Sequence, residues 1–284
     1  MSKGLPRLVV FSDPKKGQAA EVVRQFKDFV KGRARIIATC YIEDCSGATL
    51  KEADFAVVFG GDGSIISAAR HLSHRNVPVI GVNLGKLGFL AEFSFDELKK
   101  CFDSIISGKA SIEKRMMLSC KVCSGSRVKL TSSALNDVFI AAGPPFRMVE
   151  LKVLVDGQPL AGCVSDGLVI STPTGSTAYN LSAGGPILSG KMEAMVIAPL
   201  CPHSLSFRPI VISAGSTVEI LGVRVNKGTT VSVDGQISMK LSVGDVVKVE
   251  KAKGHFLIVN NLLRTEWDTL ATKLNWAEKP KYRK

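Results

Sequence analysis

The residues best suited to chemistry are the acid and the glycines of Gly60-Gly61-Asp62-Gly63-Ser64. They follow the apolar run Phe55–Phe59 and precede Ile65–Arg70, which has helical character, so the stretch predicts a buried strand, a tight turn and a helix. Glycines let backbone N–H groups approach an oxyanion closely, and a helix N-terminus adds partial positive charge. We therefore expect a phosphate to bind at Gly60, Gly61, Gly63 and Ser64.

Asp62 occupies the carboxyl end of the predicted strand, where open α/β sheets bind their ligands. A carboxylate beside a phosphate is repulsive unless it has a function. It could hold Mg²⁺, or it could take the proton of a hydroxyl that attacks phosphorus. A plain strand-to-helix turn with Asp62 as the N-cap explains this short motif equally well.

A second polar stretch, Thr172–Thr177, follows the predicted strand Leu168–Ile170 and precedes a helix, the one long helix expected after residue 112, that should begin near Thr177. Its hydroxyls and the helix N–H groups suit phosphates and ribose hydroxyls. Tyr179 offers a ring for stacking, and Asp166 can accept a hydrogen bond. A capped helix after a polar turn is the alternative, but it explains less of this polar and small-residue content.

Asn136 and Asp137 form a third candidate group. The Asn136 amide both donates and accepts, so it can bind an adenine edge or a ribose, and Asp137 can accept from a ribose hydroxyl. An Asx-turn before a strand explains this pair about as well.

The elements that must position these groups change character near residue 112. Before it, near-continuous apolar strands such as Leu8–Phe11 and Pro78–Val82 alternate with helices, one of them opened by a capping box of Ser94 and Glu97. This pattern predicts an α/β domain with a mostly parallel sheet over residues 1–112.

Short runs of alternating hydrophobicity dominate from residue 113 to 262. Turn signals such as Asp156-Gly157 and Asp234-Gly235 separate them, which predicts an antiparallel, β-sandwich-like domain. Residues 263–284 become helical or irregular again, and we expect this segment to pack back on the first domain.

Composition narrows the function classes. The 284 residues carry a net charge of +12, which favours an anionic partner, but no basic run is interleaved with aromatic residues as in nucleic-acid platforms. No apolar run is long enough to span a membrane. Seven scattered cysteines favour free thiols in a reducing, cytoplasmic setting, and no metal ligands can be assigned.

Taken together, the motifs resemble the NAD kinase family over roughly residues 55–275. The resemblance rests on Gly60–Ser64, Asn83–Leu90, Asn136-Asp137, Ser165–Pro186 and Cys201–Pro209, in that order. The Gly-Gly-Asp-Gly piece also occurs in lipid kinases and phosphofructokinases. The run from Asp166 to Pro186 is far more specific.

The resemblance implies an N-terminal α/β domain and a C-terminal β domain, with the active site in the crevice between them. It implies transfer of the γ-phosphoryl group of ATP, or of polyphosphate, to the 2′-hydroxyl of the adenosine ribose of NAD, giving NADP and ADP. It also implies a need for Mg²⁺ or another divalent metal, small-molecule substrates and not nucleic acid or membrane, and a homodimer or homotetramer.

The resemblance also assigns roles to residues. Asp62 matches the general base, and Phe89 matches an aromatic residue that lines the adenine pocket. Asp166 matches a residue that reaches the nicotinamide half, often in a neighbouring subunit. The residues matched to NAD binding are Asp62, Gly63, Phe89, Asn136, Asp137, Arg147, Asp166, Thr177, Ala178, Tyr179, Asn180, Leu181, Ser182 and Gln236.

Five positions depart from the family pattern. Ser64 replaces the usual Thr, Asp137 replaces the commoner Glu, and Val164 stands where Arg is frequent; Asn83-Leu84-Gly85-Lys86 replaces Asn-Thr-Gly-His. None of them touches the expected base.

Three other functions are compatible with some of these features. A lipid kinase would explain the glycine-acid turn but not the stretch from Asp166 to Pro186. A non-catalytic NAD-binding sensor would explain the nucleotide motifs but gains little from a carboxylate facing phosphates. A basic nucleic-acid-binding module is compatible with the charge alone and has no recognition motif.

Overall fold

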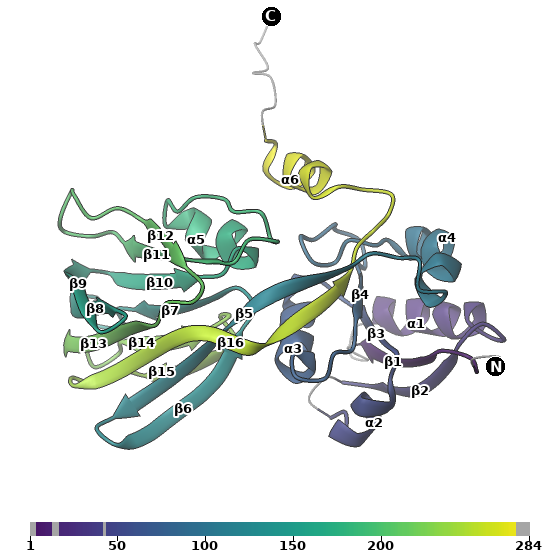
Figure 1. Ribbon diagram of the computed structural model, residues 1–284, viewed down its shortest axis with the longest axis horizontal. Helices are drawn as coiled ribbons and strands as arrows, with labels where there is room; N and C mark the ends of the chain where they lie inside the picture. Colours follow the sequence, from purple (N-terminus) through teal and green to yellow (C-terminus); the bar gives the residue numbers. More distant parts are fainter. Residues whose placement is uncertain (1–3, 13–16, 42–43, 277–284) are drawn as a thin grey trace, which may run out of the picture. The chain divides into compact units, whose positions relative to one another are not determined.

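The computed structural model of the protein describes residues 4–12, 17–41 and 44–276 (Figure 1). The chain forms two compact units. The first unit comprises the chain up to Lys114 and from Leu257 onward, and the second unit comprises Arg115–Phe256.

The first unit contains a parallel sheet, which confirms the predicted α/β fold class. Its strand order is β2-β1-β3-β4, and Ile258 of β16 pairs in parallel with Val79 of β4. The strands are β1 (Arg7–Ser12), β2 (Arg35–Cys40), β3 (Phe55–Phe59), β4 (Val79–Val82) and the last residues of β16 (Asp245–Val259).

The helices that pack on this sheet are α1 (Gly17–Phe29), α2 (Gly47–Glu52), α3 (Asp62–Leu72) and α4 (Phe95–Ile106). The last helix, α6 (Glu266–Leu274), contacts the loop before α4 instead. Val23, Phe26 and Val30 are spaced for one helical face, and all three are buried. Phe26 meets the rings of Phe59 and Phe102 edge-on at 5.2 and 6.1 Å. α1 and α4 therefore share one core with the sheet (Figure 1).

The second unit is built from antiparallel strands, as the sequence predicts. One sheet has the order β12-β11-β10-β7-β14-β15, and β8 pairs with β9 and β13, β13 with β16, and β5 with β6. The strands are β5 (Ile112–Ser124), β6 (Arg127–Ala134), β7 (Asp137–Ala141), β8 (Val149–Val155), β9 (Gln158–Ser165), β10 (Gly167–Ser171), β11 (Ala194–Leu200), β12 (Ile210–Ser213), β13 (Val218–Arg224), β14 (Thr230–Val233) and β15 (Ile237–Lys240).

Alternate residues of these strands form one buried cluster. Val138 and Ile140 of β7 belong to it together with Val218 and Ile220 of β13. Because successive side chains of a strand point to opposite faces, this spacing of two gives each strand a core face.

The helix expected from Thr177 is wrong in length. The chain forms a single 3₁₀ turn, η1 (Thr174–Thr177), and then α5 (Tyr179–Ser182), which has four residues. Gly184 has φ +76° and Pro186 cannot donate a helical hydrogen bond, so the helix ends at once.

Two further sequence features have structural counterparts. All seven cysteines lie within the described residues and are free thiols, as predicted. Among the helices of the described chain, none combines the length and apolar character required to cross a bilayer.

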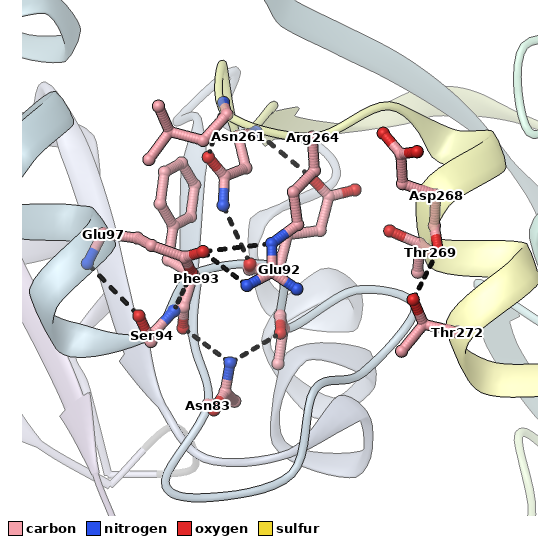
Figure 2. Close-up of polar contacts among 12 residues, drawn as sticks. Asn83, Glu92, Phe93, Ser94, Glu97, Asn261, Arg264, Asp268, Thr269 and Thr272 are labelled. Atoms are coloured by element: carbon pink, nitrogen blue, oxygen red, sulfur yellow. Dashed lines mark hydrogen bonds and ion pairs between the residues drawn. The ribbon is translucent and has the colours of Figure 1, made fainter.

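Within the first unit, polar contacts hold the chain after β16 against the segment from Glu92 to Glu97 (Figure 2). Arg264 donates from Nε to Glu97 Oε1 at 3.0 Å, and its Nη2 contacts the same oxygen. Glu97 Oε2 accepts the Ser94 N–H at 2.8 Å and so completes the predicted capping box of α4. Asn261 donates to Glu92 through its backbone N–H and its side-chain amide, at 3.1 and 3.0 Å.

These contacts control the ionisation of Glu97. Burial by itself would raise its pKa, but the hydrogen bonds from Ser94 and Arg264 outweigh burial and lower it. The ionised Glu97 carboxylate therefore stabilises the fold above its unfolded pKa of about 4.3. This contribution is lost as the pH falls through the lower folded-state pKa.

We expect Arg264→Met to lower the free energy of unfolding by about 2 kcal/mol at pH 7, because Glu97 loses a charged hydrogen-bond donor. Urea unfolding of both proteins at pH 7 and pH 3 measures this, and the difference should shrink at pH 3. The matched control is Arg24→Met, whose partner Glu21 is exposed; it should change stability by less than about 0.5 kcal/mol. An equal loss in both variants would contradict the assignment.

Candidate functional site

The glycine turn of the first unit joins β3 to α3. The Gly60 N–H donates to Val82 O at 2.9 Å, which ties the turn to β4. A Cβ on Gly60 would lie 2.4 Å from Ser64 Oγ, so the turn requires a glycine there. Gly61 is the N-cap of α3 and Asp62 is its first residue, so the N-cap interpretation of Asp62 is wrong.

The Asp62 carboxylate instead binds the backbone of a second loop. Its Oδ2 accepts the Phe89 N–H at 2.9 Å, and its Oδ1 accepts the N–H groups of Leu90 and Ala91, both at 3.0 Å. A carboxylate has about four acceptor positions, so these bonds leave room for about one more donor. They also hold the carboxylate in a single orientation.

Two glycines allow this close approach. A Cβ on Gly88 would lie 2.0 Å from Asp62 Oδ1, and a Cβ on Gly81 would lie 2.6 Å from Leu90 O. Asn83 closes the base of the loop, because its amide donates to Ala91 O at 3.3 Å and to Phe93 O at 2.9 Å (Figure 2). The loop between Asn83 and Phe93 is therefore fixed at its base and along its inner side.

Phe89 is half-buried in this loop, and a cation lies near its ring. Lys273 of α6 places Nζ 5.9 Å from the Phe89 ring centroid and donates to Leu87 O at 2.7 Å. An aromatic face beside a lysine suits a nucleotide, which carries both a base and phosphates. Sequence reasoning missed Lys273, because nothing in the spacing of residues so far apart connects it to the loop.

In the second unit, Asn136 and Asp137 lie at the start of β7. Asp137 is buried, and Asn136 is half-buried. Burial and the nearby Asp234 carboxylate raise the pKa of Asp137 to about 7, although a hydrogen bond from the Tyr179 backbone opposes them. Near neutral pH, Asp137 is therefore present in both protonation states.

The turn before α5 packs directly on this pair. Thr172 Oγ1 donates to Leu135 O at 2.6 Å and accepts the Gly175 N–H at 3.0 Å. A Cβ on Gly175 would lie 2.1 Å from Asn136 O. The structure therefore brings the predicted stretch from Thr177 to Ser182 next to Asn136 and Asp137. The Thr172 hydroxyl is thus used in hydrogen bonds to the backbone of the turn.

The side chains of α5 differ in exposure. Tyr179 is 37% exposed, and its ring meets Phe139 edge-on at 4.9 Å. Burial, followed by the charge of Asp137, raises the pKa of the Tyr179 phenol, so this group remains neutral. Asn180 is fully buried and donates to Ser176 O at 3.1 Å and Pro186 O at 3.0 Å, which holds the turn together from inside.

The remaining positions of this stretch lie beside these two. Thr177, Ala178 and Leu181 are half-buried, and Ser182 is exposed. Gln236 is exposed in the β14–β15 hairpin, directly after Asp234 and Gly235.

Two predicted residues lie at the other end of these strands. Asp166 precedes β10, in which Gly167 pairs with Ala141 while Ser171 pairs with Asp137. Asp166 and the exposed Arg147 are thus on the side of β7 where the strand ends, away from the Asn136-Asp137 pair. Asp166 is nonetheless near enough to the Tyr179 phenol for its charge to raise the pKa of that group, so the structure relates Asp166 to the cluster around Asp137 through Tyr179.

The described part of the chain contains no group of three or more His, Cys, Asp or Glu side chains arranged to hold a metal ion.

Comparisons with known proteins agree with this arrangement. The ATP-NAD kinase N-terminal domain matches residues 15–110, and the ATP-NAD kinase C-terminal domain matches residues 135–261. The chain belongs to the NAD kinase family. It is 42% identical to an NAD kinase of Geobacter metallireducens over 238 residues, which cover 82% of this chain and 84% of that protein.

Other members of the NAD kinase family cover more of the chain. An NAD kinase of Rhodopirellula baltica is 36% identical over 272 residues, covering 96% of this chain and 87% of that protein. The crystal structure of yeast NADH kinase in complex with NADH superposes with a TM-score of 0.86 at 28% identity, covering 100% of this chain and 91% of the yeast chain.

We expect the buried Asp137 to make stability depend on pH. Its folded-state pKa of about 7 exceeds the unfolded value, so protonated Asp137 stabilises the fold at low pH, and this contribution is lost as the pH rises to about 8. The wild type should lose up to about 4 kcal/mol relative to Asp137→Asn between pH 4 and pH 8.

Urea unfolding across this pH range measures the effect. The control is Asp156→Asn, which replaces an exposed aspartate of the same unit and should follow the wild type. Parallel curves for the wild type and Asp137→Asn would show that Asp137 does not titrate as described.

Proposed function

We propose that the chain transfers the γ-phosphoryl group of ATP to the 2′-hydroxyl of the adenosine ribose of NAD, with Asp62 as the general base. Phosphorylation of NAD to NADP with ATP is the activity of the family to which the chain belongs. The observation that carries the role of Asp62 is its carboxylate at the glycine turn, oriented by three backbone N–H groups.

The chemistry requires such a group. A secondary alcohol is a poor nucleophile near neutral pH, and a carboxylate within hydrogen-bonding reach accelerates its reaction by about 10²–10⁴-fold. Phosphoryl transfer otherwise demands positioning and charge neutralisation. The loop holds the Asp62 carboxylate in place before substrate arrives, and the remaining acceptor position of Asp62 is available for the ribose hydroxyl.

Phosphates would bind at Gly60, Gly61, Gly63 and Ser64, beside the N-terminus of α3. This position supplies backbone dipoles with their positive ends toward the ligand. Lys273, next to Phe89, supplies a full positive charge in the same unit.

Mg²⁺ or another divalent metal fits this arrangement as a companion of the nucleotide. ATP phosphate oxygens would hold the metal, because Mg²⁺ is usually bound through substrate phosphates and few protein groups, while the Asp62 carboxylate is assigned to the ribose hydroxyl. When bound, such a metal neutralises phosphate charge.

NAD would be recognised by the second unit. Asn136 and Asp137 lie against the turn that carries Thr177 and Tyr179, and Gln236 follows Asp234 in the adjoining hairpin. Asn136 supplies both donor and acceptor groups for an adenine or a ribose, and Asp137 supplies an acceptor.

We also propose that the chain forms a homodimer or homotetramer. Large apolar side chains of the second unit are exposed, notably Phe146 at 73% and Leu205 at 84%, and burial of such groups drives subunit association. Light scattering during size-exclusion chromatography should give two or four times the chain mass of 30.4 kDa. A mass of one chain would contradict this proposal.

We expect Asp62→Asn to lower kcat for NADP formation by about 10²–10⁴-fold while NAD binding is retained, because the variant lacks the base. NADP is measured with an NADP-specific dehydrogenase, and NAD binding by calorimetry. A kcat near that of the wild type would remove Asp62 as the base. Absence of NADP from the wild type with both ATP and polyphosphate would reject the reaction.

A second variant tests the role of the Phe89 loop separately from the role of Asp62 as the base. Gly88→Ala keeps the acid, but the new Cβ must push the loop away from Asp62, so KM for NAD should rise as Phe89 moves. Gly162→Ala is the matched control, because a Cβ there meets no atom within 4 Å.

A further inference from the structure

Asp234 lies in a tight turn, but the conformation of that turn accounts for only part of what the Asp234 side chain does. It follows β14 in the Asp234-Gly235-Gln236 connection to β15, and its φ of +54° is in the left-handed region. Aspartate and asparagine are common at such positions because their short polar side chains bond the local backbone. The Asp234 side chain instead reaches the neighbouring strand.

Its carboxylate binds three successive N–H groups at the start of β7. Oδ2 accepts from Leu135 at 3.0 Å, and Oδ1 accepts from Asn136 at 2.8 Å and Asp137 at 3.2 Å. The Asp234 N–H donates in return to Asp137 O at 2.9 Å. Hydrogen bonds to an ionised carboxylate are about twice as strong as neutral ones, so the segment is firmly held.

The carbonyl groups of the same three residues are also engaged. Leu135 O accepts from Thr172 Oγ1 at 2.6 Å, Asn136 O accepts the Thr172 N–H at 2.8 Å, and Asp137 O accepts from Asp234. The backbone of residues 135–137 is therefore committed within the protein. A ligand at this place is bound by side chains, and the backbone sets their positions.

Asp234 also acts on Asp137 through its charge. The groups that face Asp137 are the Asp234 carboxylate from the hairpin and the Tyr179 backbone N–H from α5, while Asp166 and Cys201 act on the Tyr179 phenol. Burial is the largest cause of the raised pKa of Asp137, and the Asp234 charge is the next.

We propose that Asp234 is a positioning residue for NAD: its carboxylate fixes the backbone from Leu135 to Asp137 so that the Asn136 and Asp137 side chains meet the nucleotide. This inference rests on the proposed NAD kinase function. It assigns Asp234 an action through its neighbours and no contact with the reacting atoms.

Two substitutions of Asp234 should weaken NAD binding to different degrees. Asp234→Asn keeps an oxygen for Asn136 and Asp137 but places an amide opposite the Leu135 N–H, so KM for NAD should rise about tenfold. Asp234→Gly removes all three bonds, suits the left-handed backbone, and should raise KM for NAD further. KM for ATP should stay within about twofold of the wild type, because ATP does not use this segment in the proposal.

Asp156→Asn is the matched control. Asp156 also has a left-handed backbone, with φ +53°, and also precedes a glycine in a hairpin, between β8 and β9. Its carboxylate accepts one backbone N–H, that of Thr217 at 2.7 Å, outside the segment from Leu135 to Asp137. Its KM values should equal those of the wild type.

The pH profile distinguishes positioning from a general loss of folded protein. In the wild type, KM for NAD should change with an inflection near pH 7, set by Asp137. Removal of the Asp234 charge removes one cause of the raised pKa of Asp137, so the inflection should move to lower pH in both Asp234 variants. A smaller amount of folded enzyme lowers apparent kcat and leaves KM and the inflection in place.

The result that would overturn the proposal is an Asp234→Gly variant whose KM for NAD and pH inflection equal those of Asp156→Asn. The same comparison by calorimetric Kd for NAD applies if the wild type binds NAD without forming NADP. In that case the proposed reaction fails, while the role of Asp234 in binding is still decided by the Kd values.

Discussion

The structure depends on one kind of interaction, which recurs in both units: an aspartate carboxylate that accepts several successive backbone N–H groups from a segment distant in sequence. Asp62 binds three such groups from residues 89–91, and Asp234 binds three from residues 135–137. A loop normally has few constraints of its own, because its backbone groups lack the regular partners of a helix or a sheet. A charged acceptor supplies those partners and specifies one conformation.

The same interaction explains the glycines nearby. Gly88 lies so close to Asp62 that no side chain fits between them, and Gly175 is equally close to Asn136. Both segments carry residues that bind the nucleotide in the proposed function, Phe89 in the first unit and Asn136 in the second. Their rigidity means that substrate does not have to supply the free energy of ordering them.

Much of this architecture follows from the sequence. The strand, glycine turn and helix around Asp62, the capping box of Ser94 and Glu97, and the change to antiparallel strands all have local patterns that predict them. The partners of Asp62 and Asp234 have none, because a backbone N–H exists at every residue except proline and leaves no signature. The sequence also predicts a longer helix from Thr177 than the structure has. The inward-facing Asn180 amide bonds Ser176 O and Pro186 O, and the local pattern does not reveal these partners.

The position of α6 has a consequence for biosynthesis. The loop that carries Phe89 is supported by Lys273, and Glu97 at the start of α4 is supported by Arg264, and both of these residues are synthesised after the second unit. Ile258 of β16, which extends the parallel sheet, is also synthesised after the entire second unit. The first unit is therefore begun before the second unit and completed after it, so a nascent chain cannot assemble the supported Phe89 loop until Lys273 has been synthesised.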